Sequence, residues 1–173
     1  MSDPWPYNLP IFRRSYRAPS PDGSDCAEIT GAYEVSMSNP TYGTLHTASG
    51  LVLEYCSPSF IWSDDSRYLA VPQFFMRLKV FRRQRMVIID TEARCGYRSL
   101  EVAYYYQPEN FTAGALTAIV EPFKTKKMIQ WQVPECFGAF SRFVPPGNEE
   151  ATSRVVTTAT SRSGIETLDS GGV

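Results

Sequence analysis

The sequence has little of what a metal site or a phosphate site needs. It contains one histidine, His46, and its four cysteines, Cys26, Cys56, Cys95 and Cys136, are far apart with no C-x-x-C pair. A zinc site uses several ligands at short spacing, and no glycine-rich run leads into a helix as in a phosphate-binding loop. We therefore predict no metal and no cofactor, and expect reduced cysteines that pack at strand ends as small apolar side chains.

Long apolar stretches are also missing. No segment approaches the roughly 20 apolar residues of a transmembrane helix. The N-terminal segment Met1–Ser24 interleaves prolines with arginines and lacks the apolar core of a signal peptide. The formal net charge is −1, which disfavours nucleic acid as a partner. These absences predict a cytoplasmic protein that does not enter a membrane.

What the sequence does contain indicates an all-β protein. The chain is 43% hydrophobic, which is enough to form a core, but thirteen prolines and eleven glycines interrupt it, and no apolar segment keeps helical spacing for long. We predict three regions along its 173 residues. They are an irregular arm rich in Pro and Arg over residues 1–26, a single all-β domain over 27–143, and a flexible tail rich in Ser, Thr and Gly over 144–173.

The stretch Ser57–Ser99 carries the clearest strand pattern. It reads as strand, tight turn, strand, long basic loop, strand, turn and strand, which is one four-stranded antiparallel unit. Pro72 is expected to limit the central pairing of its second strand. Met86–Ile89 is an apolar run typical of a strand that is buried on both faces. Gly96 closes the last turn and is available for a positive φ angle.

Two segments of this stretch resemble blades of the WD40 or TolB type of β-propeller. They are W-S-D-D-S-R-Y-L-A, residues 62–70, and V-I-I-D-T-E-A-R-C-G, residues 87–96; Asp64 stands where these blades usually have Pro, and Cys95 where they have Thr or Ser. A further meander is expected downstream. It has a strand that ends in a tyrosine run (Glu101–Tyr106), a turn (Pro108–Gly114) and two more strands (Ala115–Val120 and Met128–Val133). Another is expected upstream, with the strands Ala32–Met37, Thr44–Thr47 and Leu51–Tyr55.

Two to three blade-like units are too few to close a propeller, which needs about four. The fold prediction is therefore antiparallel meanders that form a sandwich, an open barrel or a partial propeller, with irregular termini. The blade resemblance implies no particular activity, because propellers serve many functions.

Candidate binding residues form a basic cluster with neighbouring aromatics and a run of three tyrosines. Five cations lie within nine residues near a predicted hairpin end, and three consecutive tyrosines in a strand would place a ring on each face. Tyrosine and arginine are enriched in binding hot spots. The residues are Phe74, Phe75, Arg77, Lys79, Arg82, Arg83, Arg85, Tyr104, Tyr105 and Tyr106. A solvated hairpin tip and a strand covered on both faces are the alternatives.

Catalytic residues are hard to find. Any Ser/His/Asp or Cys/His site would have to use His46, and no nucleophile motif accompanies it. Asp64 and Asp65 could be a general acid–base pair, but adjacent residues in a turn more often cap backbone donors. We therefore predict no enzymatic activity and no catalytic residue.

A non-enzymatic protein-binding module is the predicted function. In general appearance the chain resembles small all-β bacterial immunity proteins, which neutralise a cognate toxin of polymorphic or Rhs-type systems. The likeness rests on Y-E-V-S-M-S-N-P at residues 33–40, the W-S-D-D-S turn and the V-I-I-D strand. It implies a toxin domain as partner and occlusion of the toxin's active site. A structural subunit of a larger complex, a homo-oligomer among them, and a small hydrolase using His46 or Asp64 and Asp65 are the alternatives.

Overall fold

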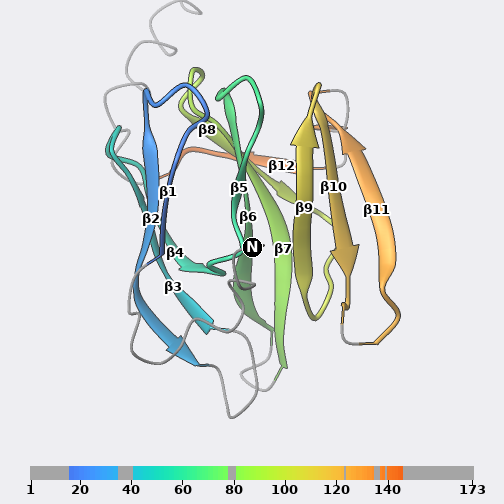
Figure 1. Ribbon diagram of the computed structural model, residues 1–173. Coiled ribbons are helices and arrows are strands. Elements are labelled where there is room, and N and C mark those ends of the chain that lie inside the picture. Colours follow the sequence, from blue (N-terminus) through green and yellow to red (C-terminus); the bar gives the residue numbers. More distant parts are fainter. Residues whose placement is uncertain are drawn as a thin grey trace, which may run out of the picture.

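The computed structural model describes residues 16–34, 41–77, 81–122, 124–134, 137–138 and 140–145, and these form twelve β-strands (Figure 1). The strands are β1 (Tyr16–Pro19), β2 (Cys26–Glu34), β3 (Thr41–Thr47), β4 (Val52–Cys56), β5 (Ile61–Trp62), β6 (Tyr68–Arg77), β7 (Phe81–Asp90), β8 (Cys95–Ser99), β9 (Tyr106–Thr112), β10 (Ala115–Val120), β11 (Lys127–Gln132) and β12 (Phe140–Phe143). The all-β prediction is confirmed.

The strands form two antiparallel sheets. The larger sheet has the order β1-β2-β3-β4-β6-β7-β8-β12, with β5 paired to β6, and the smaller has the order β11-β10-β9. Among the described strands no pairing closes the larger sheet into a barrel. Figure 1 shows β6 and β7 standing between β1–β4 on one side and β9–β11 on the other. The β6–β7 hairpin is therefore the middle layer of the fold.

Two separate cores lie on the two sides of this hairpin. The first core packs Leu69, Val71, Val87 and Ile89 against buried side chains of β2, β3 and β4, such as Ile29, Leu45 and Leu53. The second packs Tyr68, Ala70, Met86 and Ile88 against buried side chains of β9 and β10, such as Tyr106, Phe111 and Leu116. Each fully buried side chain of this size stabilises the fold by roughly 1.5–3 kcal/mol.

The double cover explains the continuous apolar run on β7. Successive strand residues point to opposite faces, so a strand with one buried face alternates between apolar and polar residues. Met86, Val87, Ile88 and Ile89 are all 0% exposed. The prediction that this segment is buried on both faces is confirmed.

The four strands predicted within Ser57–Ser99 are present as β5, β6, β7 and β8, paired in that order. The long basic loop is not: β6 and β7 pair continuously from Tyr68 and Asp90 to Arg77 and Phe81, so most of the basic residues lie in strands. Residues 78–80 of the connection lie outside the described residues.

Pro72 lies inside a strand that pairs with β7 along its whole length, so the expected limit on pairing does not apply on that side. On its other side β6 pairs, among the described strands, only with β5, at Leu69 and Ala70, and with β4, at Gln73. The partner of Pro72 on β7 is Met86, whose backbone N–H points away from β6 and donates to Ser99 Oγ at 3.0 Å. This position of the β6–β7 ladder therefore needs no donor from Pro72. On the other side the Pro72 carbonyl accepts from Ser57 N–H at 2.8 Å. A proline is tolerated here because its missing N–H leaves no bond of the β6–β7 ladder unmade.

The first β-strand lies in the segment 1–26 that the sequence predicts to be irregular. β1 pairs with β2 from Tyr16 opposite Ile29 to Pro19 opposite Cys26. The Tyr16 ring packs edge-on against Phe60 with centroids 5.2 Å apart, and Trp62 Nε1–H donates to the Ala18 carbonyl at 3.2 Å. These contacts with the first core hold the strand on the sheet edge. Residues 1–15, part of the expected strand Ala32–Met37, and residues 146–173 lie outside the described residues.

Gly96 is not the positive-φ residue of its turn. That conformation belongs to Arg94, with φ 50°, and Gly96 is a strand residue of β8 opposite Phe143 of β12. A Cβ atom on Gly96 would collide with the Phe143 ring. Glycine is needed here for close approach of an aromatic ring, not for backbone conformation.

We expect Gly96→Ala to lower the free energy of unfolding by about 1–3 kcal/mol, because the Phe143 ring has to move. Urea denaturation measures the effect. Gly138→Ala is the matched control, since no atom of the described part of the chain lies within 4 Å of the position that a Cβ on Gly138 would take. Equal stabilities of the two variants would contradict this account of Gly96.

Candidate functional site

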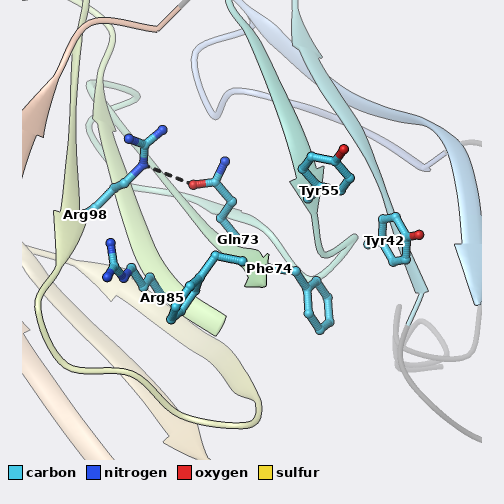
Figure 2. A pocket seen from close by; sticks show the side chains of 7 residues that line it. Tyr42, Tyr55, Gln73, Phe74, Arg85 and Arg98 are labelled. Atoms are coloured by element: carbon cyan, nitrogen blue, oxygen red, sulfur yellow. Dashed lines mark hydrogen bonds between the residues drawn. The ribbon is translucent and has the colours of Figure 1, made fainter. Parts of the chain in front are cut away.

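A cavity of about 600 Å³ lies where β3, β4 and β6 meet β7 and β8 (Figure 2). Its seven lining residues come from five strands that are neighbours in the larger sheet. They are Tyr42 on β3, Tyr55 on β4, Gln73, Phe74 and Phe75 on β6, Arg85 on β7 and Arg98 on β8. We call these seven residues the pocket.

The pocket is placed where the face of the first core changes from apolar to polar. Leu69 and Val71 of β6 belong to that core, and Gln73, two residues further along the strand, lies on the same face. On β7 Arg85 lies two residues before the core residue Val87, on the same face of the strand, and it is the register partner of Gln73. Both strands therefore place polar side chains on a core-facing surface at the same level.

The two arginines of the pocket make aromatic contacts. The Arg98 guanidinium carbon lies 3.6 Å from the Phe143 ring centroid, and Arg98 Nε–H donates to Gln73 Oε1 at 3.1 Å. The Arg85 guanidinium carbon lies 4.4 Å from the Phe75 ring centroid. Stacking on ring faces holds both guanidinium groups in defined places while it leaves several of their N–H donors available.

None of the seven lining residues is acidic. Ion pairs in the described part of the chain join Arg67 to Asp90 at 2.9 Å and to Glu92 at 3.4 Å, and neither pair involves a pocket arginine. Arg85 Nε is buried and has no hydrogen-bond partner among the described residues. A buried donor on a charged group costs free energy when it is left without an acceptor. The pocket therefore holds positive charge that the described protein does not balance.

The electrostatic cost of this arrangement appears in the pKa of Arg98. Burial lowers the pKa of the Arg98 guanidinium below its ordinary value, and the positive charge of Arg85 lowers it further. Arginine stays charged even so, because a guanidinium is not deprotonated in proteins. The two like charges are therefore kept close together at a cost to the folded state.

An aromatic row leads from the pocket across the neighbouring strands. Tyr33 on β2 lies opposite Tyr42, with ring centroids 6.5 Å apart, and Tyr42 lies 5.9 Å from both Tyr55 and Phe74. Tyr33 is 68% exposed and Tyr55 is 54% exposed. We call these four residues the aromatic row. It surrounds one side of the pocket with large rings, of which Phe74 is buried, Tyr42 is half-buried, and Tyr33 and Tyr55 are exposed.

Three of the residues predicted from the sequence line the pocket, and two others, Arg83 and Tyr104, contact each other. Phe74, Phe75 and Arg85 are pocket residues. Arg83 instead stacks on Tyr104 at 4.4 Å, and Lys124 lies 5.0 Å from the same ring. The side chains of Arg77 and Arg82 and all of Lys79 lie outside the described residues.

The tyrosine run does not form the strand face that the sequence suggested. Tyr106 begins β9, is 0% exposed and belongs to the second core. Tyr104 and Tyr105 precede the strand and are half-buried. The strand starts late because Ala103 bridges to Gln84 through two backbone hydrogen bonds. Tyr106 is thus a core residue, and the expected turn after it is largely the strand β9.

Four pocket residues were not predicted: Tyr42, Tyr55, Gln73 and Arg98. Gln73 could have been found from the hairpin register, since a continuous β6–β7 hairpin places it opposite Arg85. Tyr42, Tyr55 and Arg98 reach the pocket only because β4 pairs with β6 and β7 pairs with β8. The β4–β6 pairing skips β5, and no local sequence signal shows it.

The residues weighed for catalysis lie elsewhere. His46 is half-buried on β3, between Glu28 and Val52 in the strand register. Asp64 Oδ2 accepts from Ala113 N–H at 3.0 Å, and Asp65 Oδ1 accepts from Arg67 N–H at 3.1 Å. Both carboxylates therefore cap backbone donors of turns.

Metal and thiol sites are not formed by the described residues. These include no group of three or more His, Cys, Asp or Glu side chains that could hold a metal ion. Cys26, Cys56 and Cys95 are free thiols, and burial raises the pKa of Cys56. Cys136 lies outside the described residues.

Comparison with protein-family models, curated proteins and solved structures found no match to the chain. Across the described residues there is also no helical segment with the length and hydrophobicity that a membrane crossing requires. The geometry and charge of the pocket and the aromatic row are therefore the features that bear on function.

Proposed function

We propose that the chain is a non-enzymatic protein-binding module whose contact surface is the pocket together with the aromatic row. The observation that carries the proposal is the pair Arg85 and Arg98, held on aromatic rings with no acidic residue in the pocket lining. Arginine and tyrosine are among the residue types that are enriched in the hot spots of protein interfaces. The partner supplies the negative charge that the pocket lacks.

The size of the surface favours a macromolecule over a small solute. The exposed rings of Tyr33 and Tyr55 extend the site beyond the cavity itself. Rigid aromatic side chains lose little conformational entropy on binding and bury a large apolar area. A protein segment that enters the pocket can cover these rings at the same time.

We propose further that the partner is a bacterial toxin domain and that the chain acts as its immunity protein. This follows the resemblance of the sequence to immunity proteins, and the pocket suggests how the contact is made. A concave pocket receives a projecting acidic segment of the toxin, while the surrounding surface covers the toxin's active site. Inhibition is then steric, with the arginines fixing the register of the two proteins and speeding their encounter.

A pull-down at mild salt with the full chain as bait tests the proposed function. We expect one stoichiometric protein, identified by mass spectrometry, and we expect co-expression of the chain to protect cells from that protein if it is a toxin. Copies of the chain itself, or a multi-subunit assembly, would instead support the structural alternative. Recovery of no protein by the wild-type bait would contradict the proposed function.

Tyr55→Ala in the same experiment tests the aromatic row. We expect the variant to lose at least about 30-fold in affinity for the captured protein, because truncation of a tyrosine hot spot costs about 2 kcal/mol or more. Met128→Ala is the control, since Met128 is 67% exposed on β11 of the other sheet. Equal affinities of both variants would exclude Tyr55 from the interface.

A further inference from the structure

The unbalanced positive charge in the pocket lies at partly buried positions next to the first core and not on a fully solvated surface. Gln73 and Arg85 occupy positions that continue the apolar face of the first core. Arg85 Nε is buried and has no acceptor among the described residues, and Arg98 is half-buried beside a second cation. An apolar residue in place of Arg85 or Arg98 would avoid the free-energy cost of burying a cation in the pocket. A ligand that pairs with both guanidinium groups would offset this cost.

A carboxylate satisfies the donors that the pocket offers. A guanidinium presents parallel N–H donors that match the two oxygens of a carboxylate. Stacking against Phe143 and Phe75 leaves edge donors of Arg98 and Arg85 directed away from the rings. Gln73 Oε1 already accepts from Arg98, which holds that side chain in one orientation.

We infer that Arg85 and Arg98 together bind the carboxylate of an aspartate or glutamate side chain that the protein partner projects into the pocket. The inference rests on the proposed function and names the group that the pocket recognises. A cavity of about 600 Å³ is far larger than one carboxylate, so it also takes the methylene groups and backbone beside it. The rings of Phe74 and Tyr42 supply the apolar wall for this segment.

The features of the pocket favour a carboxylate over a phosphate. Phosphate sites commonly use the backbone N–H groups of a helix N-terminus or of a glycine-rich turn, whereas this lining comes from the side chains of five β-strands. The chain as a whole carries a net charge of −1 and so gives no general attraction to nucleic acid. One acidic side chain between two arginines offers an acceptor oxygen to each guanidinium and offsets one of their two positive charges.

Titration of the isotope-labelled full chain with short peptides tests the inference by NMR. The main probe is an N-acetylated, C-amidated hexapeptide that contains two glutamates. Its counterpart contains two glutamines instead, a third peptide contains the glutamines with a free C-terminal carboxylate, and the last probe is inorganic phosphate. We expect saturable shifts of the Arg85 and Arg98 Nε–H resonances with the glutamate peptide, and binding at least roughly tenfold weaker with the glutamine peptide.

Two variants and a control locate the binding. Arg85→Gln and Arg98→Gln should each weaken the glutamate peptide by at least about tenfold, while Lys127→Gln, an exposed cation on β11, should leave it unchanged. Arg98→Lys keeps the charge but removes the paired donors, and we expect an intermediate loss. Spectra of the free variants show whether each one is folded.

Several results would overturn the inference. The first two are equal affinities for the glutamate and glutamine peptides, and an unchanged affinity for the glutamate peptide in both the Arg85→Gln and the Arg98→Gln variant. The last two are saturation by phosphate without saturation by the glutamate peptide, and binding of only the peptide with the free C-terminal carboxylate. The last two would assign the pocket to another anion. A partner retained with unchanged affinity by the Arg85→Gln bait would refute the inference and leave the proposed function standing. A wild-type bait that retains no protein would refute the proposed function, while the peptide titration still reports on the pocket.

Discussion

Ile88→Ala and Ile89→Ala are each expected to lower the free energy of unfolding by about 2–5 kcal/mol. The two side chains are adjacent on β7 and point in opposite directions, Ile89 into the first core and Ile88 into the second. Both are 0% exposed. Each truncation removes buried apolar surface and leaves a cavity that the surrounding side chains fill only in part.

Equilibrium unfolding in urea measures both costs, with Met128→Ala as an exposed control that should change stability by less than about 0.5 kcal/mol. In a two-layer sandwich one of two consecutive strand residues usually faces solvent. A cost below about 1 kcal/mol for either isoleucine would therefore mean that β7 has one uncovered face and that the three-layer arrangement is wrong.

Arg85→Glu is expected to reduce the affinity for the protein partner by at least about 30-fold. The substitution places a carboxylate beside Arg98, where we propose that the partner's own acidic side chain binds. The new glutamate both repels that side chain and occupies the guanidinium that would receive it. Affinity measured by calorimetry or surface plasmon resonance gives the size of the loss.

Two controls accompany this variant. The free protein should be as stable as the wild type or more stable, because the substitution removes the repulsion between Arg85 and Arg98. Exchange of the partner's acidic residue for arginine should restore part of the affinity. Loss of binding together with loss of stability would indicate a folding defect and would not support a contact at Arg85.

The salt dependence of binding should follow the same residues. A wild-type complex that uses both arginines should weaken as ionic strength rises, chiefly through slower association. The Arg85→Glu complex should lose much of this dependence. The comparison separates electrostatic recognition in the pocket from apolar contacts of the aromatic row, which salt affects little.

The middle of the fold could be predicted from local pattern. The apolar run Met86–Ile89 indicated a strand covered on both faces, and the small polar residues after Trp62 and Ile89 marked the turns that end β5 and β7. Errors arose where pairing partners, not local sequence, decide the outcome. Pro72 is tolerated because of the register of β6 with β7, and Gly96 is required because Phe143 lies against it.

The site was predicted only in part for the same reason. Phe74, Phe75 and Arg85 stood out as a basic and aromatic cluster close together in sequence. Arg98 and Tyr55 join them because β7 pairs with β8 and β4 pairs with β6 across the sheet. The sequence places Tyr106 on a binding surface because a tyrosine in a strand can face solvent, whereas in the fold the β6–β7 hairpin of the larger sheet covers it.

The most direct test of the central claim is a pair of parallel pull-downs, with the wild-type chain and the Arg85→Glu variant as baits at equal concentration and mild salt. The claim is that the pocket formed around Arg85 and Arg98 binds an acidic protein partner. It predicts one protein enriched on the wild-type bait and largely absent from the variant. Equal recovery of the same protein on both baits would show that the partner binds elsewhere on the surface and would contradict the claim.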